Sequence, residues 1–152
     1  MKDLTKEEAI KQLQELQNYI ENIDKKPTID DITSFEKALE ILKNEKIDIF
    51  HQYEFVRNID WVNYQLEIIV KAVNYIDNNY KLWYPDWNNK NESKYYPYFE
   101  YKNDGWCFGA VYVPHWGCVG SGSFAHFKNE KSIKTIVNRF INLYDYKLKN
   151  GF

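Results

Sequence analysis

The chain has 152 residues, a length typical of one domain, and its hydrophobic content of 44% with a net charge of −2 excludes a disordered protein. Residues 1–80 carry 16 acidic and 10 basic side chains and residues 81–152 carry 6 and 10, and neither imbalance is large enough to identify a nucleic-acid partner by itself. A charged start (MKDLTKEEAIK) and the lack of a membrane-length apolar run predict a cytoplasmic protein.

Helical periodicity dominates residues 1–80, which we treat as a helical N-terminal region. Thr5 and Glu8 form a capping box, and apolar residues then recur at spacings of three and four from Ile10 to Ile23. A second helix is predicted from Thr28 or Thr33 to about Asn44, and the short connection favours an αα-hairpin between the two. Residues 46–56 are compatible with a loop, a short strand or a helical turn.

A third helix is predicted from an N-cap at Asp60 to about Asn78. Its apolar residues cover two sides: Val62, Leu66, Ile69, Val73 and Ile76 on one, and Trp61, Tyr64, Ile68 and Tyr75 on the other. A helix that is apolar on two sides lies between layers or faces a second chain. We favour the first interpretation, and a homodimer through this helix is the alternative.

The pattern changes after Tyr80. We predict strands at Tyr96–Lys102, Trp106–Val113 and Cys118–Phe127, the first two joined by the hairpin signal Asn103-Asp104-Gly105. A last helix, capped by Asn129, is predicted from Glu130 to about Leu148. The expected fold is therefore α+β: about three N-terminal helices, then a three-stranded antiparallel β-meander packed by a C-terminal helix. Regions 1–80 and 81–152 are expected to form one unit.

Aromatic residues make up 18% of the chain and are concentrated between residues 80 and 116. Their rings either stack on unpaired bases or sugars, anchor a protein interface, or fill a small core. We predict that Trp83 or Trp87 closes the core and that Tyr96, Tyr98 and Trp116 are exposed. The candidate binding residues are Trp83, Trp87, Lys94, Tyr95, Tyr96, Tyr98 and Trp116.

Catalytic and metal-binding patterns are weak. No GxSxG, Walker-type loop, HExxH or GxGxxG occurs, and Gly120-Ser121-Gly122-Ser123 lies within a strand pattern. Two cysteines give no disulfide framework. A zinc set of Cys107, His115, Cys118 and His126 has unusual spacing, and strand pairing would hold its cysteines apart. We expect no enzyme activity, no metal and no cofactor.

From Leu82 onward the chain resembles a family of small proteins encoded by phages and prophages. The shared motifs are W-x-P-D-W-N-N, found here at residues 83–89, and K-Y-Y-P-x-F, found at residues 94–99. Later matches are Val119-Gly120-Ser121, Phe127-Lys128, Phe140 and Tyr144. The resemblance covers about 70 residues and implies a phage accessory protein, many of which block host defence systems, as anti-CRISPR proteins do.

Two hypotheses of function follow. The first is a phage-encoded, non-enzymatic protein that inhibits a host defence nuclease, such as a CRISPR effector, by occupying a protein or guide-RNA surface. It would act in the cytoplasm of the infected bacterium. The alternative is a single-stranded nucleic-acid binding module, in which the aromatic side chains stack on bases and Lys90, Lys94 and Lys102 contact phosphates.

Overall fold

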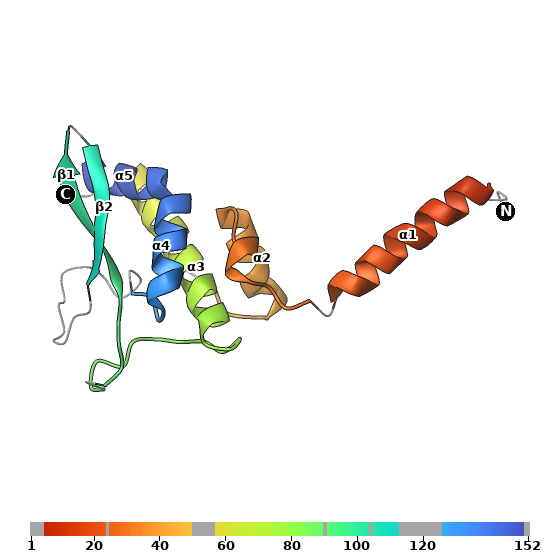
Figure 1. Ribbon diagram of the computed structural model, residues 1–152, viewed down its shortest axis with the longest axis horizontal. Coiled ribbons are helices and arrows are strands. Elements are labelled where there is room, and N and C mark those ends of the chain that lie inside the picture. The colour runs from red at the N-terminus through yellow and green to blue at the C-terminus, as the bar shows by residue number, and fades with distance from the viewer. Residues whose placement is uncertain are drawn as a thin grey trace.

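The computed structural model of the chain consists mainly of helices (Figure 1). It describes residues 5–23, 25–49, 57–89, 91–103, 105–112 and 126–150. No helix in these ranges is both long enough and apolar enough to cross a membrane. In chain order, the elements are α1 (Lys6–Ile23), the 3₁₀ helix η1 (Ile29–Asp31), α2 (Phe35–Asn44), α3 (Asn58–Asp77), β1 (Tyr96–Lys102), β2 (Gly105–Tyr112), α4 (Glu130–Arg139) and α5 (Ile141–Asn150).

The predicted α+β fold with a three-stranded meander is wrong, because helices dominate the described chain and its sheet consists of two strands, β1 and β2. Residues 118–125 of the expected third strand lie outside the described residues, and Phe127 forms only an isolated bridge with Tyr95. A two-stranded sheet is too small to form a core of its own. The helices therefore supply the core, and the sheet is an addition to it.

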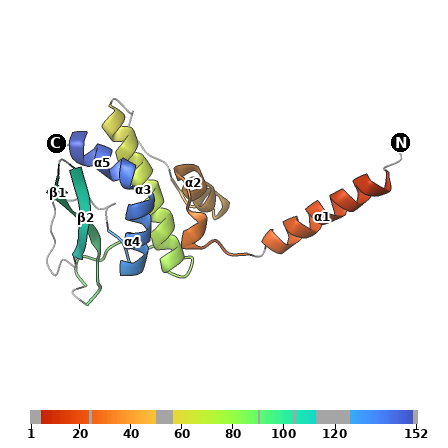
Figure 2. The ribbon, with the colours of Figure 1, turned by 45° about the horizontal axis from the view of Figure 1, so that its top comes forward.

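α3 lies at the centre of the molecule, between α2 on one side and α4 and α5 on the other, with the sheet beyond them (Figures 1 and 2). Its buried side chains include Val62, Leu66, Ile69 and Val73 from one predicted side and Ile68 and Tyr75 from the other. The predicted position between layers is confirmed. Trp61 on the second side is 39% exposed, and the alternative of a homodimer through α3 stays a prediction.

α1 extends away from the rest of the chain (Figures 1 and 2). The capping box is confirmed, since the Thr5 amide donates to Glu8 Oε2 at 2.9 Å and the Glu8 amide donates to Thr5 Oγ1 at 3.3 Å. The predicted hairpin with α2 is wrong. The apolar stripe of α1 does not pack on α2, because α2 buries its own apolar face in the core around α3. That face consists of Phe35, Ala38, Ile41 and Leu42.

The remaining helix starts differ from prediction by a few residues. α2 begins after Ser34, whose hydroxyl accepts the Lys37 amide, while Thr28 precedes η1. Asp60 is not the N-cap of α3. It lies in the first turn, where its carboxylate accepts the amide of Arg57 at 3.0 Å.

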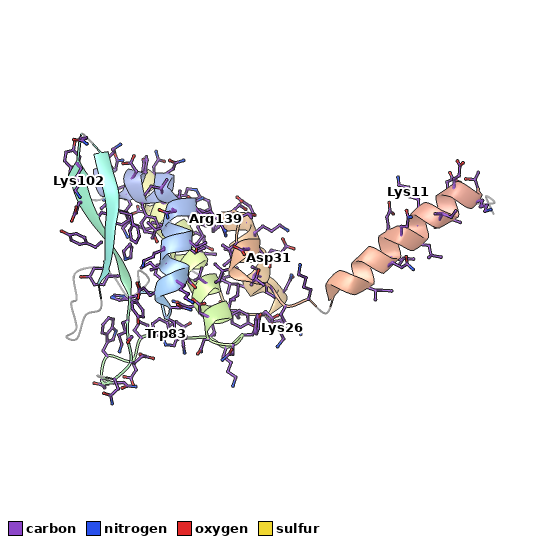
Figure 3. The ribbon with its side chains drawn as sticks, viewed as in Figure 1. Lys11, Lys26, Asp31, Trp83, Lys102 and Arg139 are labelled. Atoms are coloured by element: carbon purple, nitrogen blue, oxygen red, sulfur yellow. The ribbon has the colours of Figure 1, made fainter. Side chains whose placement is uncertain are left out.

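Arg139 joins α4 to the segment at η1, since its guanidinium donates to the carbonyls of Ile29 and Ile32, both at 2.8 Å (Figure 3).

The β1–β2 hairpin has the predicted antiparallel pairing and the predicted bounds for β1. Lys102 pairs with Gly105, and Asn103 takes a positive φ of 48°, as a two-residue hairpin turn requires. The register shifts between Tyr98 and Phe99, which leaves Gly109 as an extra residue on β2. Phe99 packs against Phe108 and Tyr144, with ring centroids 6.0 Å and 5.3 Å apart, and so joins the sheet to the helical core.

The single C-terminal helix predicted for residues 130–148 is two helices. Asn129 caps α4 as expected, with its side-chain oxygen accepting the Lys131 amide at 3.0 Å. α4 ends at Phe140, whose φ of −111° and ψ of 27° leave the helical range, and α5 follows. The break lets α5 pack on α3 while α4 contacts the sheet, yet the apolar residues of both helices still enter one core.

Candidate aromatic binding site

A hollow of about 190 Å³ lies between α3 and the segment that leads from α3 to the sheet. One face of α3 forms its floor, through Glu67, Val70, Lys71 and Asn74. Figure 3 shows Trp83 on the opposite segment, near the end of α3. The wall of the hollow opposite α3 consists of Trp83, Tyr84, Pro85, Trp87 and His126. The hollow is large enough for one side chain or a small planar group, and most of its wall is aromatic.

Glu92 holds the segment that carries the two tryptophans. Its carboxylate accepts the Trp83 indole N–H at 2.8 Å and the Asp86 amide at 2.9 Å. It also pairs with the Lys94 ammonium at 3.2 Å. Burial raises the pKa of Glu92, but the hydrogen bonds from Asp86, Trp83 and Lys94 outweigh it and hold the pKa below its usual value of 4.5.

Lys94 is 3% exposed and takes part in this scaffold. Its ammonium donates to the carbonyls of Asn89 and Glu92, both at 3.1 Å, and lies 5.7 Å from the ring centroid of Trp87. The Lys94 ammonium thus has two carbonyls and the Glu92 carboxylate as partners within the chain, and its predicted contact with phosphates stays a prediction that this burial disfavours. Two Asx turns lie in the same segment: the Asn88 amide donates to Asp86 Oδ1 at 2.9 Å and the Asn91 amide donates to Asn89 Oδ1 at 3.0 Å.

Asn74 of α3 binds the backbone of the segment that carries His126. It is buried in the last turn of α3, where its side-chain amide donates to the His126 carbonyl and its oxygen accepts the Lys128 amide, both at 2.8 Å. On the other side of this segment, Tyr95 and Phe127 exchange two backbone hydrogen bonds. Residues 126–128 are thus held from both sides, and His126 is placed against the tryptophan segment.

Aromatic edges complete the wall. The His126 ring meets the Trp87 ring edge to face, with centroids 4.9 Å apart and planes at 85°, and contacts Tyr96 in the same way at 5.9 Å. Trp87 remains 44% exposed and Tyr84 65% exposed. The rings of Trp87 and Tyr84 are therefore accessible to solvent beside the hollow. Their neighbours Trp83 and His126 are held in place by the hydrogen bonds to Glu92 and Asn74.

The hollow carries one carboxylate and one ammonium among its described lining residues. The Lys71 ammonium turns aside to donate to the Asp48 carbonyl at 2.7 Å. Glu67 makes no hydrogen bond or ion pair with another residue of the described ranges, although its charge and the burial of Tyr64 together raise the pKa of that phenol, with burial the larger cause. The lining therefore carries one charge of each sign: the ammonium of Lys71 is bonded to a carbonyl, and the carboxylate of Glu67 is the group without such a bond in the described ranges.

The structure separates the predicted binding residues. Trp83 is buried, as expected for one of the two tryptophans, and Trp87 is exposed. Tyr98 is exposed on β1, whereas Tyr95 and Tyr96 are half-buried, so the expected exposure of Tyr96 is wrong. Trp83, Trp87, Lys94, Tyr95 and Tyr96 are brought together around Glu92, His126 and Phe127. Several residues singled out in the sequence lie outside the described residues: Lys90, His115, Trp116, Cys118 and residues 120–123.

Sequence reasoning missed Asn74, Glu92 and the lining role of Glu67. Asn74 had a detectable signal, since it is the polar residue within the run Ala72–Ile76 on a helix that is buried on two sides. Glu92 had none, because its role depends on three donors that the turn brings together. In the described part of the chain, no three potential metal ligands lie close enough to hold an ion.

Comparison with protein-family models, curated proteins and solved structures finds no match to this chain. The resemblance of residues 82–152 to phage proteins therefore stays a prediction from the motifs at residues 83–89 and 94–99.

The charge of Glu92 should make the stability of this segment depend on pH. Because the pKa of Glu92 is lower in the folded chain than its usual 4.5, the ionised carboxylate stabilises the fold above pH 4.5, and this contribution is lost as the pH falls through the lowered value. We expect Glu92→Gln to lower the thermal midpoint at neutral pH and the difference from wild type to vanish in acid. The measurement is thermal unfolding of both proteins across a pH series.

Glu130→Gln is the control for the pH series, since it removes an exposed carboxylate that pairs only along α4 with Lys134. It should change the midpoint little at any pH. An equal midpoint for wild type and Glu92→Gln at neutral pH would contradict the supporting role of Glu92.

Proposed function

We propose that this chain is a phage-encoded, non-enzymatic protein that inhibits a host defence nuclease, such as a CRISPR effector. It would bind a surface of the nuclease in the cytoplasm of the infected bacterium. The observation that carries the proposal is the hollow beside the exposed rings of Tyr84 and Trp87, with the carboxylate of Glu67 in its floor. A few anchoring residues seated in such a hollow supply most of the energy of many protein interfaces.

The chemistry of the hollow favours a cationic side chain of the partner. Aromatic faces attract a guanidinium or ammonium group, and the negative charge of Glu67 adds to that attraction. Nucleases bind nucleic acid through basic grooves, which present arginine and lysine side chains. An arginine or lysine of such a groove, inserted between Trp87 and α3, would anchor the inhibitor where the nuclease binds its guide or target.

Nucleic-acid stacking has weaker support. Tyr84, Trp87 and Tyr98 do offer exposed rings, but Lys94 is buried and its ammonium donates to the carbonyls of Asn89 and Glu92. Lys71 and Glu67 place one charge of each sign in the lining of the hollow, so a phosphate backbone would meet no net positive charge from these two residues.

Tyr84→Ala should weaken binding to the nuclease, whereas Tyr146→Ala should not. Both changes remove an exposed tyrosine ring, but Tyr146 lies on α5 and does not line the hollow. We expect the Tyr84 change to raise the Kd at least about tenfold, a loss typical of an interface anchor. The measurement is capture of the tagged protein's partner from host lysate, with and without nucleic-acid digestion, followed by titration and a cleavage assay with the purified nuclease.

Glu67→Gln tests the cation in the same assay and should weaken binding more at low salt than at high salt. Capture of nucleic acid alone, lost on digestion, would reject the inhibitor and support stacking. A nuclease that binds Tyr84→Ala and wild type equally would place the contact elsewhere on the chain.

A further inference from the structure

α1 is the one α-helix of the described chain whose described side chains are all exposed. Ile10, Leu13, Leu16 and Ile20 form its apolar stripe and are between 50% and 62% exposed. Both views show the helix standing clear of α2 to α5 (Figures 1 and 2). An amphipathic helix of this kind derives its stability from whatever covers its apolar side.

The residues that follow α1 are held to the part of the chain that contains α2 to α5, called the body below. The Tyr80 hydroxyl donates to the Pro27 carbonyl at 3.1 Å, and the Lys26 ammonium lies 4.6 Å from the centroid of the same ring. α1 therefore leaves the body at a defined point. The helix itself has 18 residues and is about 27 Å long, a length at which an isolated helix is marginal in water.

The spacing along α1 fits pairing with another helix. Ala9, Leu13, Leu16 and Ile20 follow one another at intervals of four, three and four, the a and d positions of a heptad repeat. Ile10 widens the stripe on one side. Such a seam interdigitates with a helix that carries the same spacing, which a second copy of this chain supplies.

The charges on α1 also favour a second copy. The positions beside the seam that face a partner helix hold the uncharged Gln12 and Gln17. The charged residues Glu7, Glu8, Lys11 and Glu15 lie on the opposite face, and Lys6 lies at the N-terminal end of the seam, seven residues before Leu13. Two identical antiparallel helices hold their Lys6 side chains at opposite ends, so they can approach along the rest of the seam without like-charge repulsion.

We propose that the chain forms a homodimer in which α1 pairs with α1 of a second copy along the stripe Ile10, Leu13, Leu16 and Ile20. The interface is isologous, since each copy contributes the same face. The two bodies stay apart, and each keeps its aromatic hollow open to a partner. This inference concerns a different surface from the proposed function and stands without it.

The double variant Leu13→Gln/Leu16→Gln tests the dimer. Glutamine keeps the net charge and a similar helix propensity but removes the apolar contact. Sedimentation over a concentration series should give twice the mass of one chain for wild type and a single-chain mass for the variant. Far-UV circular dichroism should show helix content that falls with dilution in wild type as the dimer dissociates. The thermal midpoint of the body reports that the variant still folds.

Lys11→Gln/Glu15→Gln is the matched control, because it also introduces two glutamines into α1, on the opposite face, with no change in net charge. It should remain dimeric. A wild type that is monomeric throughout, a dimer that survives in Leu13→Gln/Leu16→Gln, or a dimer lost equally in the control would each overturn the proposal. A monomeric wild type whose capture of the nuclease fails in the leucine variant would assign the stripe to the nuclease instead.

Discussion

Asn74→Ala is expected to destabilise the fold by about 2–4 kcal/mol, because the change leaves two backbone groups without partners and each costs about 1–3 kcal/mol when buried. The His126 carbonyl loses its donor in a buried position, and the Lys128 amide loses its acceptor in a part-buried one. Since His126 forms part of the wall against Trp87, the hollow should open as well. Denaturant unfolding gives the free-energy change, and the part of the tryptophan emission that is lost in Trp87→Phe reports the environment of Trp87, one of five tryptophans.

Asn63→Ala on the same helix is the control for Asn74. Its side-chain oxygen is buried and accepts no hydrogen bond from the described residues, so its removal should cost much less. Equal losses for the two alanine variants would show that the clamp on residues 126–128 contributes nothing specific.

Phe127→Ala should cost about 3–5 kcal/mol, the range for removing a large buried aromatic side chain. Phe127 is fully buried in the core cluster, and its backbone forms the bridge to Tyr95. Removal of the ring leaves a cavity where α3, the segment that carries Trp83 and Trp87, and the start of α4 meet. Denaturant unfolding at constant temperature is the measurement.

Phe127→Leu tests whether the cavity causes this loss, since alanine and leucine both leave the backbone bridge to Tyr95 in place. Leucine fills much of the same space and keeps the backbone hydrogen bonds, so it should lose less than half of what alanine loses. Were alanine to cost less than about 1 kcal/mol, residue 127 would not be part of a packed core.

Local patterns predicted the helices and β1 well. The Thr5–Glu8 box, the Asn129 cap and the extent of β1 depend on residues within a few positions of one another, and the structure has each of them. The two-sided periodicity of α3 also predicted its burial between layers. The break at Phe140 was missed, because the apolar spacing continues across it and only the packing of α5 on α3 requires the change of direction.

The aromatic segment shows where local patterns stop being informative. Trp83, Trp87 and Lys94 were correctly grouped, but the sequence could not tell which of them would be exposed. Burial of Lys94 depends on the carbonyls of Asn89 and Glu92 converging on its ammonium, and burial of Trp83 depends on the carboxylate of Glu92. Neither convergence follows from spacing, since it arises from the path of an irregular segment.

The sequence by itself determined which segments are helical, which residues can form a core and that an aromatic cluster lies between residues 80 and 116. Only the tertiary structure decided that α1 stands apart with its stripe uncovered, that Asn74 reaches across more than fifty residues to hold His126, and that Glu67 lines the hollow beside the aromatic rings. The physical reason is that periodicity specifies which face of a helix is apolar but not what covers that face. Contacts between distant segments depend on how the helices pack.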